Sequence, residues 1–242
     1  MTSGKIGIAI KGSRFSLQHY MKTVNGRNIL SDLIISSSPS LLSFMGQDLC
    51  INWKSPLPLP EGLPYQEFYE YRDDFLKILN YSDAELRNKN SIIRSHWPKN
   101  GPQWDGLAVV TGANGEQGAL LIEAKSHTGE MKASMNAEPA SAAKITGTFD
   151  MVQNKMGIIS NEWTKEYYQL SNRIAFLYIM NEILEIPTWL VLVNFINDPF
   201  KPTTLKEWLI HYNLILRKMG INDSVKLLDR IIMVFPGGKG KE

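Results

Sequence analysis

Cysteine and histidine are scarce in this sequence. Cys50 is the only cysteine among 242 residues, and there are four histidines. One cysteine excludes an internal disulfide and fits a reducing cytoplasm, which is where we expect the chain to work. Neither residue type has the spacing of a zinc site, and Gly-x-Ser-x-Gly and Gly-x-Gly-x-x-Gly motifs are absent. The sequence therefore argues against a zinc protein, an α/β-hydrolase and a dinucleotide-binding protein.

Long hydrophobic runs and a strong excess of one charge are also missing. The longest apolar stretch, near residues 189–196, is far shorter than the roughly 18–20 residues that span a bilayer. Residues 6–10 are apolar but too few for a signal peptide, so we expect no secretory signal and no membrane partner. The net charge of +2 neither demands nor excludes nucleic acid.

The composition is that of a globular domain with a substantial core. Hydrophobic residues make up 43% of the chain, including six Trp and nine Phe. Prolines at positions 56, 58 and 60 predict a stiff extended link. We therefore expect an N-terminal appendage of unclear fold (1–60), an α/β core (61–236) and a flexible tail (237–242).

Hydrophobic periodicity and capping signals predict helices interspersed with strands. The expected helices are residues 15–23, 66–79, 82–97, 140–156, 162–184 and 204–218, and the expected strands are 6–10, 29–35, 104–110, 118–125, 188–196 and 230–235. This order indicates an α/β fold with a mixed central β-sheet flanked by helices.

The clearest local signal is a β-hairpin with charged residues near the outer ends of its strands. Asn114 and Gly115 lie between two apolar runs, which is a strong hairpin signal. Glu123 and Lys125 share a face of the second strand because side chains alternate. The loop length leaves Asp105 opposite either Glu123 or Ala124. Only the first register brings Asp105, Glu123 and Lys125 together.

Two carboxylates in a half-buried sheet repel each other unless a cation lies between them. Mg²⁺ is usually bound by one or two carboxylates, and a nearby lysine can orient a water or stabilise charge on a phosphate. The alternative is an ion pair between Glu123 and Lys125 at the sheet edge, with a solvated Asp105. Spacing alone leaves both interpretations open.

Asp105 followed by Glu123-Ala124-Lys125 resembles the active-site motif of the PD-(D/E)XK nuclease superfamily. Trp104 replaces the proline of that motif, at a position that varies in the superfamily. A helix, the hairpin, a long helix and an apolar strand follow the superfamily's core order over roughly residues 66–198. The segments 97–98, 123–127 and 168–173 also resemble an uncharacterised bacterial branch of it.

The resemblance implies a restriction-endonuclease-like core and a metal-dependent nuclease that hydrolyses phosphodiester bonds, with DNA expected over RNA. Asp105 and Glu123 would be catalytic and would bind Mg²⁺ or Mn²⁺, with the Ala124 carbonyl as a further ligand. Lys125 would be the third catalytic residue, positioning the attacking water.

The resemblance also predicts which residues bind the substrate. Gln169, Asn172 and Arg173 share one face of the helix over residues 162–184, and in the superfamily this helix lines the substrate groove. Arg173 would contact a phosphate. His127 would assist if the strand persists beyond Lys125. The alternatives are a solvated helix face and a polar residue at a strand end.

Several assignments stay open. An upstream helix usually adds a carboxylate, for which the candidates are Glu67, Glu70, Asp74 and Glu85; Glu130 could approach the metal through a water. The basic segment 87–99 could follow a phosphate backbone, with Trp97 stacking on a base. The alternative function is a catalytically silent nuclease-fold module that binds nucleic acid or a protein partner. A toxin or defence component that needs a partner chain, and a homodimer, also remain open.

Overall fold

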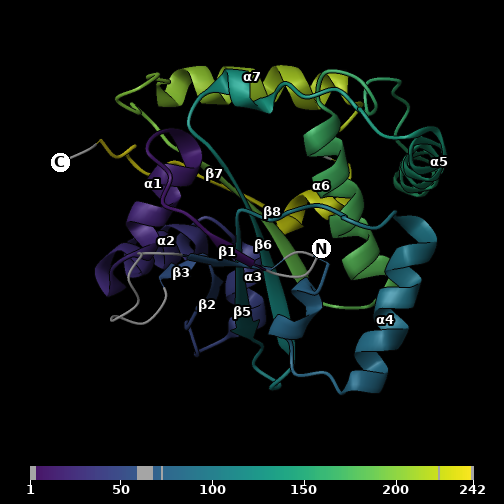
Figure 1. The fold of residues 1–242 in the computed structure, drawn as a ribbon, viewed down its shortest axis with the longest axis horizontal. Coiled ribbons are helices and arrows are strands. Elements are labelled where there is room, and N and C mark those ends of the chain that lie inside the picture. Colours follow the sequence, from purple (N-terminus) through teal and green to yellow (C-terminus); the bar gives the residue numbers. More distant parts are fainter. Residues whose placement is uncertain (1–3, 59–67, 72, 223, 241–242) are drawn as a thin grey trace.

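The computed structural model describes residues 4–58, 68–71, 73–222 and 224–240, which form an α/β structure. Its centre is a five-stranded mixed sheet in the order β2-β5-β6-β7-β8 (Figure 1). The strands are β2 (Asn52–Ser55), β5 (Gly106–Thr111), β6 (Gln117–Lys125), β7 (Thr188–Asn194) and β8 (Ile231–Val234). β2, β5 and β6 are antiparallel, whereas β7 runs parallel to β6 and β8 parallel to β7.

Seven α-helices of the described residues cover the two faces of this sheet. The first face packs on α1 (Gly12–Met21), α2 (Val24–Ser36) and α3 (Pro39–Met45). The second face packs on α4 (Asp83–His96), α5 (Pro139–Met156), α6 (Tyr168–Tyr178) and α7 (Leu205–Lys218). In the described part of the chain, no helix combines the length and the apolar character needed to cross a membrane.

Short elements complete the fold. β1 (Gly4–Ile6), β4 (Phe68–Glu70) and β3 (Leu57–Pro58) form a small second sheet. Single turns of 3₁₀-helix lie at Phe75–Ile78, Thr128–Met131 and Lys226–Arg230, and a π-helical turn at Ile179–Ile183 extends α6.

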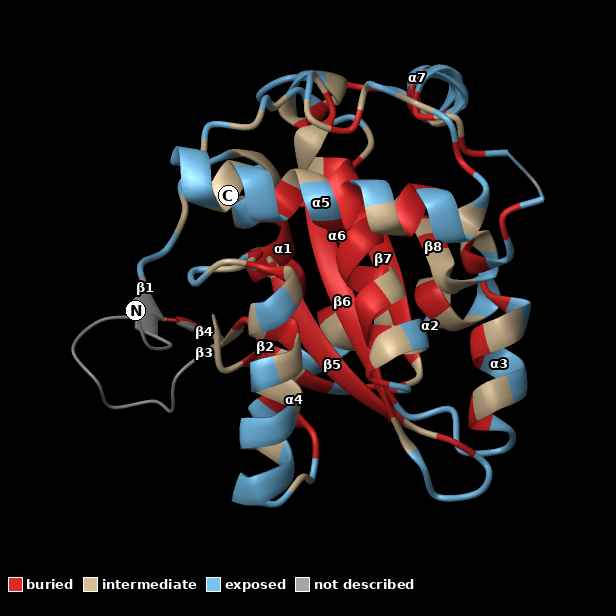
Figure 2. Ribbon diagram, turned by 90° about the vertical axis from the view of Figure 1, so that its right-hand side faces the viewer, coloured by how far each residue is buried: buried red, intermediate tan, exposed pale blue. Residues whose placement is uncertain are grey.

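The central strands are buried on both faces, and alternation decides which face each side chain joins (Figure 2). In β6, Leu120 and Ile122 pack into the core on the α1–α3 side, whereas Leu121 packs into the core on the α6 side. Glu123 and Lys125 continue the series of Leu121. The sequence therefore directs both polar side chains toward α6.

The predicted hairpin is confirmed, together with the register that its chemistry requires. Gly106 pairs with Ile122 and Thr111 with Gln117, so the next residue outward, Asp105, lies opposite Glu123. The connecting turn has Gly115 at φ +83°, a backbone conformation that favours glycine. Of the two registers that the sequence left open, the structure has the one that places Asp105 opposite Glu123.

The capping signals also predicted helix ends well. Ser82 and Glu85 form the expected capping box of α4, and Thr204 and Glu207 form one at α7. The helix expected over 162–184 is shorter, because α6 begins only at Tyr168. The preceding segment is fixed instead by the Trp163 indole, which donates to the Met219 carbonyl at 3.0 Å.

Three expected elements are wrong. Of the strand expected over 6–10, only Ile6 lies in a strand, at the end of β1. The strand expected over 29–35 lies within helix α2, where Leu30 and Ile34, four residues apart, are buried on one helix face. The helix expected over 66–79 is strand β4 followed by a 3₁₀ turn wherever the structure describes it. Phe75, Leu76 and Ile78 are all buried in the core, so contacts with distant residues override the helical spacing of this segment.

Both ends of the described chain contact the main body. Residues 1–60, expected as an appendage, contribute β2 to the central sheet and three helices to one of its faces. In the expected tail, the Gly237 carbonyl accepts a hydrogen bond from the Tyr20 hydroxyl at 3.0 Å. The Lys239 amide donates to the Ser16 hydroxyl at 3.1 Å. The first and last segments are therefore joined through α1.

Two helical glycines provide a test of this packing. A methyl group at Gly26 of α2 would lie 2.2 Å from the Tyr20 carbonyl oxygen, whereas nothing lies within 4 Å of one at Gly147 of α5. We expect Gly26→Ala to lower the free energy of unfolding by about 1–3 kcal/mol through overpacking. Gly147→Ala should raise it by about 0.5–1 kcal/mol because alanine favours helix. Urea denaturation of both variants measures this, and equal effects would contradict the packing around α2.

Candidate active site

A buried carboxylate lies at the centre of the site. Glu123, near the end of β6, is only 4% exposed. One of its oxygens, Oε1, accepts a hydrogen bond from the Lys125 ammonium group. The other, Oε2, lies 2.7 Å from both Nε and Nη2 of Arg173 on α6. Burial alone would raise the pKa of Glu123, but Arg173 and then Lys125 outweigh it, so the pKa is lowered and the group stays charged.

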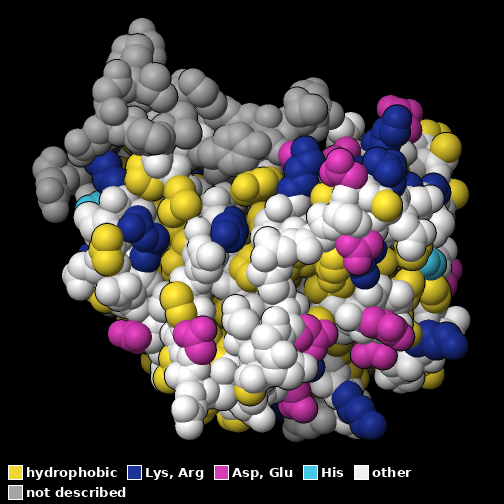
Figure 3. Space-filling model, turned by 90° about the horizontal axis from the view of Figure 1, so that it is seen from below, with side chains coloured by type: hydrophobic (Ala, Val, Ile, Leu, Met, Phe, Trp, Pro, Cys, Tyr) yellow, Lys and Arg dark blue, Asp and Glu magenta, His cyan; other side chains and the backbone are white. Residues whose placement is uncertain are grey.

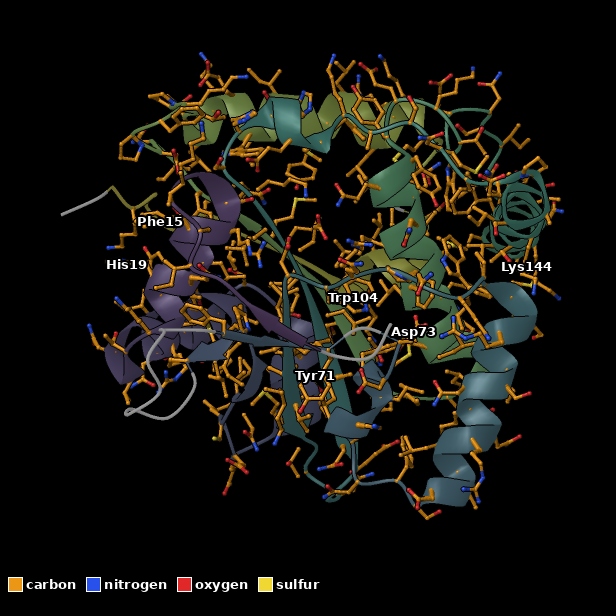
Figure 4. All side chains as sticks on the ribbon, viewed as in Figure 1. Phe15, His19, Tyr71, Asp73, Trp104 and Lys144 are labelled. Carbon is orange, nitrogen blue, oxygen red and sulfur yellow. The ribbon has the colours of Figure 1, made fainter. Side chains whose placement is uncertain are left out.

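Arg173 is fixed by more than its ion pair. Its Nη2 also donates to the Gln103 carbonyl at 2.8 Å, and its guanidinium lies 4.7 Å from the centre of the Trp104 ring. Trp104, labelled in Figure 4, is 1% exposed and precedes Asp105 directly. Gln103 and Trp104 lie just before β5, so the contacts of Arg173 connect α6 with the start of the hairpin.

Asp105 is the second carboxylate of the site. Its Oδ2 accepts a hydrogen bond from the Ala124 amide at 2.8 Å, which connects the two strands just beyond their regular pairing. Burial, followed by the negative charge of Glu123, raises the pKa of Asp105 to about 7. Asp105 and Glu123 therefore interact electrostatically, as two carboxylates that share a site do.

A small cavity lies between Glu123 and α6. Its volume is about 10 Å³, room for about one water molecule. Polar side chains on its wall belong to Glu123, Lys125, Gln169, Arg173 and Tyr212. The Tyr212 hydroxyl donates to Asn194 Oδ1 at 2.7 Å, and Asn194 is the register partner of Lys125 across β6 and β7. Met131, Leu170 and Leu192 complete the wall, so polar groups meet an apolar surface there.

A larger open groove, of about 540 Å³, borders the first turns of α6. Gln169, Asn172 and Arg173 all line it, so the structure brings together the three residues that the i, i+3, i+4 pattern placed on one helix face. Gln169 and Arg173 line both the groove and the small cavity. Arg173 therefore belongs both to the groove wall and to the ion pair with Glu123.

The donor set fits a hard divalent cation. Asp105, Glu123 and the Ala124 carbonyl offer only oxygen atoms, the ligands that Mg²⁺ prefers. Within the described ranges, no group of three or more His, Cys, Asp or Glu side chains could hold a metal ion. The expected set contains two carboxylates and one main-chain oxygen. A cation bound there would compete with Arg173 and Lys125 for the oxygens of Glu123.

His127 and Glu130 lie in the turn after β6. The strand ends at Lys125, so the alternation that would direct His127 toward the substrate stops before it. The His127 ring instead faces Glu130, with Nε2 at 3.7 Å from Oε1. Glu130 accepts hydrogen bonds from the amide and hydroxyl of Ser126. His127 is not among the residues that line the groove or the small cavity.

The candidates for an additional carboxylate have different positions. Glu85 caps α4, and Asp74 lies 3.5 Å from Lys77 in an ion pair. Glu67 and the side chain of Glu70 lie outside the residues that the structure describes. Neither Glu85 nor Asp74 lines the cavity beside Glu123.

The expectation that Trp97 stacks on a base is wrong. Trp97 is 2% exposed and packs edge-on against Phe176, with the ring centres 5.0 Å apart. In the same basic segment, Arg94 pairs with Asp73 at 2.9 Å, and Asp73 also accepts from the amides of Asn100 and Gly101. Lys99 lines the groove. Of this segment, Trp97, Pro98 and Lys99 line the groove and residues 87–96 do not.

Sequence reasoning missed Trp104, Gln103, Asn194 and Tyr212 as parts of the site. Asn194 carried a signal, because it is a polar residue in an otherwise apolar run and is fully buried. Tyr212 carried none, because it lies at a core position of an amphipathic helix. Gln103 contributes only its main-chain carbonyl, which no side-chain pattern reveals.

Comparisons of this chain with known family models, curated proteins and solved structures found no match. The site is therefore interpreted from its own residues and geometry.

The Glu123–Arg173 pair can be tested by a double-mutant cycle. Removing one partner of a buried ion pair leaves an uncompensated charge, so we expect Arg173→Met to lower the free energy of unfolding by about 3–5 kcal/mol. Adding Glu123→Gln should recover part of that loss. The exposed pair Glu162–Lys165 serves as a control, because Lys165→Met should cost less than about 1 kcal/mol. Strictly additive effects at positions 123 and 173 would contradict the pairing.

Proposed function

We propose that this protein is a metal-dependent nuclease with a restriction-endonuclease-like PD-(D/E)XK core, acting on DNA rather than RNA. The observation that carries the proposal is the convergence of Asp105, Glu123 and Lys125 at the end of one hairpin, beneath α6. The hairpin of β5 and β6 comes before α6 and the parallel strand β7, which supports the proposal, although α4 lies between β2 and β5 and α5 lies between β6 and α6.

Asp105, Glu123 and the carbonyl of Ala124 would hold Mg²⁺ or Mn²⁺. When bound, such an ion lowers the pKa of a water molecule and polarises a phosphoryl oxygen. The two strands hold the carboxylates at a fixed register, and the hydrogen bond from the Ala124 amide orients Asp105. The protein's contribution is thus a rigid pair of carboxylates in a largely buried site.

Lys125 would position the attacking water and offset the negative charge that develops on phosphorus. Its ammonium group contacts both Glu123 and, at 3.4 Å, the Ala124 carbonyl, so it lies among the proposed metal ligands. Arg173, Asn172 and Gln169 would hold the phosphate backbone of the substrate in the groove. Glu123 and Arg173 form one ion pair, so metal binding and the placement of Arg173 are coupled.

Cleavage assays test the proposal. We expect the wild-type protein to cut DNA with Mg²⁺ or Mn²⁺ and to be inactive with EDTA, because the carboxylates need the ion. Lys125→Ala and Asp105→Ala should lower the rate by about a hundredfold or more while circular dichroism shows a native fold. Linear, circular and single-stranded DNA, together with RNA, should be compared to define the substrate.

Lys165→Ala is the matched control, because Lys165 is an exposed lysine whose ammonium group lies 3.0 Å from Glu162. It should cut like the wild type. Unchanged activity in Lys125→Ala would contradict the proposed role of Lys125. Binding of nucleic acid without cleavage under every condition would instead favour a catalytically silent module, or one that needs a partner chain.

Metal binding can be measured separately from activity. A ligand that binds only the folded state raises thermal stability, by about 2.7 kcal/mol at a hundred times its dissociation constant. We therefore expect Mn²⁺ to raise the Tm of the wild type and to raise that of Asp105→Ala much less. Differential scanning fluorimetry over a series of Mn²⁺ concentrations measures this. The same shift in both proteins would place any bound ion elsewhere.

A further inference from the structure

The groove beside α6 is lined by neutral polar and apolar side chains in similar numbers, and it reaches Arg173, the ion-pair partner of Glu123. It is bordered by the segment after α4, by residues 133–138, by the first turns of α5 and by α6. Amide and hydroxyl groups on its wall include Gln103, Asn136, Ser141, Gln169 and Asn172. Such groups donate and accept hydrogen bonds without charge, which suits the edges of bases and sugars as well as phosphate oxygens.

The charges of the groove nearly cancel. Its charged residues are Lys99, Glu138 and Arg173, and Arg173 is already paired with Glu123. On the face of the molecule shown in Figure 3, basic and acidic side chains are likewise interspersed. Strong binding to a duplex backbone depends on many Lys and Arg contacts to phosphates. We therefore expect the groove to contact the base and the sugar of a nucleotide as well as its phosphate.

The volume of the groove also fits the binding of whole nucleotides. A volume of about 540 Å³ lies within the roughly 300–1,000 Å³ of pockets that enclose small organic molecules. It suits one or two nucleotides but not a stacked, paired helix. Tyr168 on the groove wall is partly exposed and offers an aromatic side chain beside these amides.

We infer that the groove binds a single strand of nucleic acid, with one or two unpaired nucleotides held between α5, α6 and the segment after α4. The inference rests on the proposed nuclease function, because it names the substrate class that reaches Lys125. A paired duplex would have to open before its bases entered the groove.

The test measures the binding of a labelled DNA strand to the protein by fluorescence anisotropy, in the absence of metal ions. The probe is a labelled mixed-sequence DNA strand of about 12 nucleotides, within the roughly 4–16 that single-strand sites cover. It is measured alone and annealed to its complement, in EDTA. We expect the single strand to bind at least about tenfold more tightly than the duplex. Equal or tighter binding of the duplex would overturn the inference.

Ser141 allows a substitution that should preserve the fold. It lies in the first turn of α5, where an acidic residue favours the helix. Ser141→Glu should weaken single-strand binding about fivefold by repelling phosphates, and Ser141→Lys should strengthen it. Ala143→Glu adds the same charge to an exposed position of α5 outside the groove lining and should leave binding unchanged. Equal effects of Ser141→Glu and Ala143→Glu would also overturn the inference.

A competition experiment separates a strand from a free nucleotide. Unlabelled thymidine monophosphate should displace the strand only at far higher concentration than an unlabelled strand does. Competition at equal concentration would make the groove a small-molecule site and overturn the inference. Because these measurements need no metal and no cleavage, they are independent of the nuclease assay. A protein that binds single strands but never cuts them would contradict the proposed function alone.

Discussion

The negative charge of Glu123 constrains the whole centre of this molecule. A carboxylate that is 4% exposed on a central strand is costly unless cations and hydrogen bonds surround it. Lys125 supplies one cation from the same strand, and Arg173 supplies the second from α6. Arg173 in turn requires the Gln103 carbonyl and the Trp104 ring. The charge therefore determines how α6, the start of β5 and the end of β6 fit together.

This arrangement also explains where the polar residues of the site lie. The sheet is apolar on both faces along the middle of β6 and β7. The charged residues of these strands, Glu123 and Lys125, lie toward one end together with Asn194. α6 crosses the sheet there and presents Gln169 and Arg173 to both the small cavity and the groove. The same helix therefore contributes residues to the buried set of charges and to the open groove.

The parts of the fold that depend on local rules could be predicted from the sequence. The Asn-Gly turn predicted the hairpin and the alternation along β6 placed Glu123 and Lys125 on one face, while two registers for Asp105 stayed open until the structure placed it opposite Glu123. The cap residues Ser82 and Thr204 predicted the starts of α4 and α7. These signals lie within a few residues of what they determine. The i, i+3, i+4 spacing likewise placed Gln169 and Arg173 on one face.

The parts that depend on distant contacts could not be predicted. The residues of α2 resemble a strand because they are rich in isoleucine and leucine, and only their packing on the sheet decides for a helix. The pairing of β2 with β5 joins segments about fifty residues apart, which no local pattern encodes. Arg173 was expected to face a phosphate, but its ion pair with Glu123 depends on how α6 docks.

Anomalous diffraction from crystals soaked with Mn²⁺ tests the central claim most directly, because it locates the ion without relying on activity. We predict one strong anomalous peak between the carboxylates of Asp105 and Glu123, next to the Ala124 carbonyl. We also expect Arg173 to lose at least part of its contact with Glu123. A structure in which Arg173 and Lys125 still hold Glu123 at saturating Mn²⁺, with the metal bound elsewhere or not at all, would contradict the account.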